Sequence, residues 1–167
     1  MNYHISDPSP LIEATFQRIY EDRMVGLPMV NPLLSVAAVG FSLQEGKEWR
    51  GAVLTPWGIN LMLLPASADW LMPNSHERTF RKYPSGAFAF LGNHEDGLGE
   101  YLICPLVHDM QHYDGQQTAL NTARACLIAL DLVPDLPATP ASPAPPTPDP
   151  EQPASPSRRR FFTRQSV

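Results

Sequence analysis

The sequence predicts an α+β fold in which an antiparallel, meander-like sheet of five strands is flanked by an N-terminal and a C-terminal helix. Two segments with helical periodicity stand at the ends of residues 1–133, and five short runs rich in Val, Leu, Ile and aromatic residues lie between them. Short connections favour antiparallel pairing. The expected order is α-β-β-β-β-β-α, with both helices on one face of the sheet.

The first helix is expected to begin with Ser9 as N-cap and Pro10 at the first helical position. Its apolar residues recur at three- and four-residue spacing up to about Arg23, and the segment GLPMVNP (residues 26–32) ends it. The closing helix is expected after a capping box formed by Asp114 and Gln117.

Five strands are expected between the helices, at residues 35–43, 49–55, 59–64, 85–91 and 100–104. Residues 65–84 form a connection that is too long for a simple hairpin. Long connections in compact domains are usually functional or disordered, and the large apolar side chains of this one argue against disorder.

Composition divides the chain into three parts. Residues 1–133 form the globular domain, residues 134–157 hold ten of the 19 prolines and are expected to be a disordered linker, and residues 158–167 form a basic-aromatic tip. Residues 1–133 carry 8 Lys and Arg against 14 Asp and Glu, a net charge of −6. This acidic balance disfavours nucleic acid and favours a basic ligand.

No window approaches the roughly 18 apolar residues of a membrane span, and the segment MNYHISDPSP does not resemble a secretion signal. We therefore expect a cytoplasmic protein without membrane insertion. Cys104, His108, Asp109 and His112 allow a Cys/His enzyme or a metal site, but no further motif accompanies them. We expect no catalytic residues, no metal and no cofactor, with Cys104 and Cys126 as reduced, buried thiols.

A partner-binding site is expected where large apolar side chains gather on connections. Trp57 lies in a tight turn, and Trp70, Leu71 and Met72 follow one another in the long connection, with Met62 on the strand between. Adjacent methionines and tryptophans suit an adaptable apolar groove. The alternative is that the connection folds back over the sheet and buries these side chains.

Acidic residues are expected at the rim of that groove. Glu95, Asp96 and Glu100 surround the turn GNHEDGLG, where ordinary solvated turn chemistry is the alternative explanation. Carboxylates beside an apolar groove fit a ligand in which paired arginines precede an apolar helix, because guanidinium groups bind carboxylates bidentately.

Several segments together resemble the HybE/HupJ-type chaperones for assembly of [NiFe] uptake hydrogenases. They are AVLTPWGINLMLLP (52–65), YPSGAFAF (83–90), GEYLICPL (99–106), the helix DGQQTALNTARA (114–125) and the tip SRRRFF (157–162). The resemblance implies a cytoplasmic assembly factor that binds the hydrogenase small subunit through its twin-arginine signal peptide and delays export until maturation is complete. Some relatives add a rubredoxin-like module, but this chain lacks the paired C-x-x-C that would hold its iron.

Two further hypotheses accompany this resemblance. The protein can instead be a scaffold that contacts the folded small subunit or other hydrogenase maturation proteins and does not bind the signal peptide. The tip itself, with Arg158, Arg159, Phe161 and Phe162, imitates a twin-arginine motif at the wrong end of a chain for export. We hypothesise that it guards the empty groove, and a solubilising or partner-docking tail is the alternative.

Overall fold

A six-stranded antiparallel sheet lies between two helices in the computed structural model, which describes residues 3–73 and 77–134. The elements are α1 (Ser9–Ile19), the π-helical turn η1 (Tyr20–Met24), β1 (Ala37–Gln44), β2 (Glu48–Thr55), β3 (Gly58–Pro65), β4 (Arg78–Tyr83), β5 (Gly86–Glu95), β6 (Gly99–Val107) and α2 (Gln116–Leu130). The α+β class is confirmed. From residue 135 onward, the predicted linker and tip lie outside the described residues.

The sixth strand, β4, was not predicted and lies within the long connection between residues 65 and 84. It pairs with β5, so that Phe80 stands opposite Ala89, and it forms one edge of the sheet. The strand order is β1-β2-β3-β6-β5-β4, which places β3 beside β6 and departs from a simple meander. An edge strand needs only one apolar face, and the segment RTFRKY therefore has no apolar run by which to recognise it.

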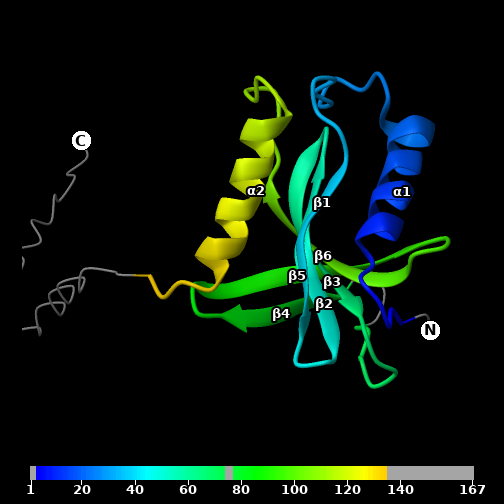
Figure 1. Ribbon diagram of the computed structural model, residues 1–167, viewed down its shortest axis with the longest axis vertical. Helices are drawn as coiled ribbons and strands as arrows, with labels where there is room; N and C mark the ends of the chain where they lie inside the picture. The colour runs from blue at the N-terminus through cyan, green and yellow to red at the C-terminus, as the bar shows by residue number, and fades with distance from the viewer. Residues whose placement is uncertain (1–2, 74–76, 135–167) are drawn as a thin grey trace, which may run out of the picture. The chain divides into compact units, whose positions relative to one another are not determined.

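The two helices cover opposite faces of the sheet, and not one face as predicted (Figure 1). On β2, Val53 packs in a cluster with residues of α1, whereas Ala52 and Leu54 pack in a cluster with residues of α2. Neighbouring residues of a strand point to opposite faces. The central strands β2 and β3 are therefore buried on both sides, and Leu61, Met62, Leu63 and Leu64 are all fully buried.

The expected helix caps are also corrected. Pro8, not Ser9, is the N-cap of α1. α2 begins after Gly115 and has no hydrogen bond from a capping side chain, so Asp114 and Gln117 do not form a capping box. The packing of both helices on the sheet supplies the stability that the caps do not.

Tyr101 of β6 packs in the cluster beneath α1, edge-on to Phe16 with the ring centroids 6.2 Å apart. Burial, assisted by the charge of Glu95, raises the pKa of Tyr101 to about 12. Its pKa in the unfolded chain is lower, near 10, so the neutral phenol stabilises the fold below pH 10. That contribution is lost as the pH rises through 12.

We therefore expect wild type to lose about 2–3 kcal/mol more stability between pH 10 and pH 12 than the variant Tyr101→Phe. Urea unfolding at a series of pH values measures the difference. Tyr3→Phe, which alters an exposed tyrosine, is the matched control and should follow wild type. Equal alkaline losses in wild type and Tyr101→Phe would contradict the assignment.

Candidate functional site

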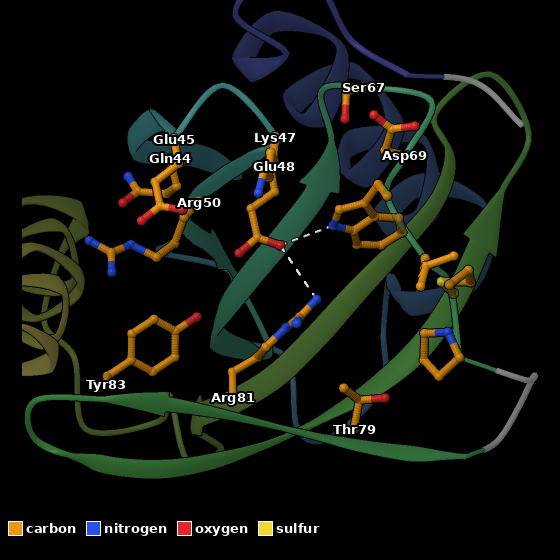
Figure 2. Close-up of a pocket in the computed structure, with 14 residues that line it drawn as sticks. Gln44, Glu45, Lys47, Glu48, Arg50, Ser67, Asp69, Thr79, Arg81 and Tyr83 are labelled. Carbon is orange, nitrogen blue, oxygen red and sulfur yellow. Dashed lines mark hydrogen bonds and ion pairs between the residues drawn. The ribbon is translucent and has the colours of Figure 1, made fainter.

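An open groove of about 670 Å³ lies between the β1–β2 turn, the connection after β3, and strand β4. Figure 2 shows its polar side chains facing one another across this space. The groove, as the term is used below, is lined by Gln44, Glu45, Lys47, Glu48, Arg50, Ser67, Asp69, Trp70, Leu71, Met72, Pro73, Thr79, Arg81 and Tyr83. Its volume is within the range of ordinary ligand pockets.

Glu48, the first residue of β2, connects two walls of the groove. Its Oε2 accepts a hydrogen bond from the indole Nε1 of Trp70 at 2.9 Å and lies 3.6 Å from Nη2 of Arg81 (Figure 2). The connection after β3 and strand β4 are thereby both tied to the β1–β2 turn. The groove is consequently held open by bonds within the chain, and a preformed site loses less entropy when it binds.

Arg50, also on β2, is held in place at another side of the groove. It donates two hydrogen bonds to Asp131, at 2.9 and 2.7 Å, and its guanidinium lies 5.4 Å from the centre of the Tyr83 ring. Burial, with the nearby charge of Glu48, raises the pKa of Tyr83 to about 12. This phenol is therefore neutral at physiological pH and offers a hydrogen bond rather than a charge.

The charges that remain for a partner are mostly negative. Glu45 and Asp69 are exposed, and neither forms an ion pair with another described residue. Lys47 of the groove is likewise exposed and forms no ion pair with another described residue. Once the internal pairs are set aside, two carboxylates and one ammonium group face the solvent here.

An apolar shelf adjoins these carboxylates. Leu71 is 84% exposed, and Met72 is half-buried with its methyl group above Gly92 of β5, where an added Cβ would lie 2.7 Å from Met72 Cε. Trp70 is only 5% exposed and anchors the shelf. Trp70, Leu71 and Met72 all line the groove, but Trp70 packs in the core cluster around Phe90, as the alternative of a connection folded back over the sheet predicts for it.

Two other expected groove residues lie elsewhere. Met62 is fully buried on the face covered by α1 and does not reach the surface. Trp57 is half-buried in the β2–β3 turn and stacks on Tyr20, with the ring centroids 6.2 Å apart. The register puts this turn at the opposite end of the β2–β3 hairpin from Glu48 and Trp70, because Thr55 pairs with Gly58 and Glu48 with Pro65. The predicted cleft containing both tryptophans does not form.

The expected acidic rim is likewise separate from the groove. Glu95 accepts two hydrogen bonds from Arg23, at 3.0 and 2.9 Å, and is therefore occupied. Asp96 is exposed in the β5–β6 turn, and Glu100 is half-buried. None of the three lines the groove.

Sequence reasoning missed the residues that supply the charges of the groove. Glu45 and Glu48 belong to the segment QEGKE, which predicted only a turn. Arg81 and Tyr83 lie on β4, where alternate residues face the groove. Exposed and half-buried positions alternate along this strand in the structure, but the sequence RTFRKY shows no matching alternation of polar and apolar residues and so gave no signal for them.

The Cys/His alternative gains no geometric support. Cys104 packs in the core cluster around Phe90, and burial raises the pKa of its thiol, which disfavours the nucleophilic thiolate. His108 and Asp109 are exposed beyond the end of β6. Among residues 3–73 and 77–134, no group of three or more His, Cys, Asp or Glu side chains is arranged to hold a metal ion. Within the same ranges, neither helix is long and apolar enough to span a membrane.

The described residues form an α+β domain, and no recognisable catalytic arrangement of side chains is found among them. A solved structure shares this fold. The solution structure of HybE from Escherichia coli superposes with a TM-score of 0.65, covering 100% of this chain and 96% of that one at 24% sequence identity. At this level of identity the likeness concerns the fold alone.

The family is shown by the sequence comparison. Residues 7–164 match the family model described as "[NiFe]-hydrogenase assembly, chaperone, HybE", and the chain belongs to this family. The hydrogenase expression/formation protein HoxT of Azotobacter vinelandii is 36% identical over 124 residues, which cover 74% of this chain and 80% of that protein.

A further relative is longer than this chain. "Probable rubredoxin HupJ" of Rhodobacter capsulatus is 38% identical over 120 residues, which cover 70% of this chain and 42% of that protein. The chain therefore matches less than half the length of this relative. The sequence holds two cysteines, Cys104 and Cys126, too few for a site of four cysteine thiolates.

Proposed function

We propose that this chain is an assembly chaperone for an uptake [NiFe]-hydrogenase that binds the twin-arginine signal peptide of the small subunit in the groove. It acts in the cytoplasm and delays export until the small subunit is mature. Family membership supports the role in hydrogenase assembly. The groove supports the choice of ligand.

The observation that carries the proposal is the juxtaposition of charge and apolar surface in the groove. Glu45 and Asp69 offer carboxylates that are free of ion pairs within the described chain, and Leu71 and Met72 form the shelf beside them. A twin-arginine signal peptide presents two guanidinium groups followed by an apolar stretch. Its arginines can bind the carboxylates bidentately while its apolar stretch covers the shelf.

The expected affinity is compatible with holding and then releasing a client. Covering the shelf buries roughly 300 Å² of apolar surface on the two partners together, worth about 8 kcal/mol before costs, and hydrogen bonds to the two carboxylates add about 3–6 kcal/mol. Association and side-chain ordering cost about 4–15 kcal/mol. We expect binding in the micromolar range, which lies within the limits of these values and is tight enough to retain a precursor and weak enough to release it.

Calorimetric titration of the full chain with a synthetic twin-arginine signal peptide tests the proposal. We expect a micromolar dissociation constant, and at least tenfold weaker binding when both arginines are replaced by lysines, because an ammonium group cannot bind bidentately. Absence of binding, or equal affinity for the two peptides, would contradict it. In the first case, co-purification with a small subunit that lacks its signal would favour the scaffold function.

We also propose that the C-terminal tip competes with the client for this groove. Arg158, Arg159, Phe161 and Phe162 lie outside the described residues, and the proposal rests on their likeness to the client motif. A tethered tip has an effective concentration of order millimolar, so an intrinsic dissociation constant of about 10 μM would weaken client binding roughly a hundredfold. Truncation after Pro134 should therefore strengthen signal-peptide binding. Unchanged or weaker binding would refute the competition.

A further inference from the structure

A second apolar surface lies at the other end of the domain from the groove. Between η1 and β1, four large apolar side chains within nine consecutive residues are 40–64% exposed. They are Val25, Leu27, Met29 and Leu33, and we call them the platform. Exposed apolar side chains that are clustered in one loop mark interaction sites more often than scattered single ones do.

The platform is fixed in place by buried hydrogen bonds. Asn31, in its middle, is buried and donates through Nδ2 to the carbonyls of Met110 and Tyr113, at 2.8 and 2.9 Å. Its backbone N–H donates to the carbonyl of Pro56 at 2.8 Å. Three loops are therefore joined, and the platform loop and the loop before α2 lie together at one end of the domain (Figure 1). A rigid apolar surface loses little entropy on binding.

The helical turn that precedes the platform in the chain also has an unusual backbone conformation. The π-helical turn η1 leads into it, and Tyr20 at the start of η1 stacks on Trp57. π-Helical turns are rare and frequently mark functional sites.

Exposed carboxylates lie on two segments that border the platform. Glu21 and Asp22 precede it in η1, while Asp109 and Asp114 flank the residues to which Asn31 is bonded. The adjacent cation, Arg23, is already paired with Glu95. The surface is thus apolar at its centre and negative at its edge.

We propose that the platform is a second docking surface, and that its occupant is a basic amphipathic helix of a partner protein. The apolar face of such a helix covers Leu27, Met29 and Leu33, and its lysines or arginines lie against the surrounding carboxylates. A second copy of this chain is a poor occupant, because two platforms in contact would bring two sets of four carboxylates together.

This surface is independent of the groove and goes beyond signal-peptide binding. The Thr55–Gly58 turn, which Asn31 contacts through Pro56, and the Glu48 side of the groove lie at opposite ends of a β-hairpin. Seven residue steps of about 3.3 Å separate them by roughly 23 Å. The chain can therefore hold a signal peptide and a second partner at the same time.

Nuclear magnetic resonance of the full chain tests the inference, with two synthetic helical peptides as probes. One has an apolar leucine face bordered by lysines, and the other replaces every lysine with glutamate. We expect the lysine peptide to shift the amide signals of residues 25–34 and 108–114 and the glutamate peptide to leave them unchanged. Leu33→Ser should weaken lysine-peptide binding about tenfold. Ile128→Ser is the matched control, because Leu33 and Ile128 are both 64% exposed, and it should have no effect.

Prior saturation with a twin-arginine signal peptide should leave binding of the lysine peptide intact. Displacement by the signal peptide would instead make the platform the signal-peptide site and overturn the proposal of a second partner. Shifts that map elsewhere, or equal effects of the two serine variants, would also overturn it. Self-association that Leu33→Ser abolishes would identify a second copy as the occupant.

Discussion

The double variant Glu45→Lys/Asp69→Lys should bind a twin-arginine signal peptide at least a hundredfold more weakly than wild type. Both carboxylates are exposed in the groove and are free of ion pairs with other described residues. Each change removes a charge-assisted bidentate hydrogen bond and adds a repulsion, and a loss of about 1.4 kcal/mol at each site gives a hundredfold. Calorimetry at low ionic strength measures the dissociation constant of the signal peptide, and circular dichroism checks that the variant is folded.

The matched control reverses two carboxylates outside the groove, in Asp22→Lys/Asp96→Lys. This pair produces the same change in net charge, and Asp96 belongs to the acidic turn that the sequence suggested as the rim. We expect at most a several-fold loss, which disappears at high salt because of screening. Equal losses in the two double variants would mean that overall charge, and not the groove, attracts the peptide.

Replacing Asn31 with Ala should destabilise the fold by about 3–4 kcal/mol. The side chain is buried and donates to two carbonyls, those of Met110 and Tyr113, while its Oδ1 accepts the backbone N–H of Leu33. Loss of three hydrogen bonds at about 1 kcal/mol each, with partner groups left buried, gives this magnitude. Urea unfolding measures the free energy of unfolding directly.

Asn121→Ala provides the comparison, because Asn121 is exposed on α2 and its bonds to Gln117 and Arg124 are at the surface. Its expected cost is below about 1 kcal/mol. If Asn31→Ala were equally mild, the three loops would not depend on this side chain and the platform would not be rigid.

Local sequence patterns predicted most of the elements but not how they face one another. Periodicity placed both helices and five of the strands. The sequence did contain a sign that the helices cover opposite faces of the sheet, because β2 and β3 contain continuous apolar runs such as LMLL. Strands covered on both faces have such runs, whereas a sheet with one solvated face alternates. The edge strand β4 was missed because its six residues include three charged side chains and only two aromatic ones, Phe80 and Tyr83.

Only part of the groove could be predicted from the sequence, because its sides come from separate segments of the chain. The shelf of Trp70, Leu71 and Met72 is consecutive in sequence, so its composition identified it. Of its carboxylates, Asp69 directly precedes Trp70, but Glu45 and Glu48 come from the segment QEGKE, and the contact of that segment with the shelf depends on the Trp70–Glu48 hydrogen bond between residues 22 positions apart. No local pattern encodes that pairing. Sequence proximity to a glycine-rich turn favoured Glu95, which the structure pairs with Arg23 instead.

Site-specific photocrosslinking tests the central claim most directly. A photoreactive residue replaces exposed Leu71 in the groove or, as the comparison, exposed Leu33 at the opposite end of the domain, in cells that produce the small-subunit precursor. Binding of the signal peptide in the groove predicts a crosslink from position 71 to the precursor, mapping to its signal segment and absent when that segment is deleted. A signal-dependent crosslink from position 33 but not from position 71, or a crosslink from position 71 that persists without the signal, would contradict it.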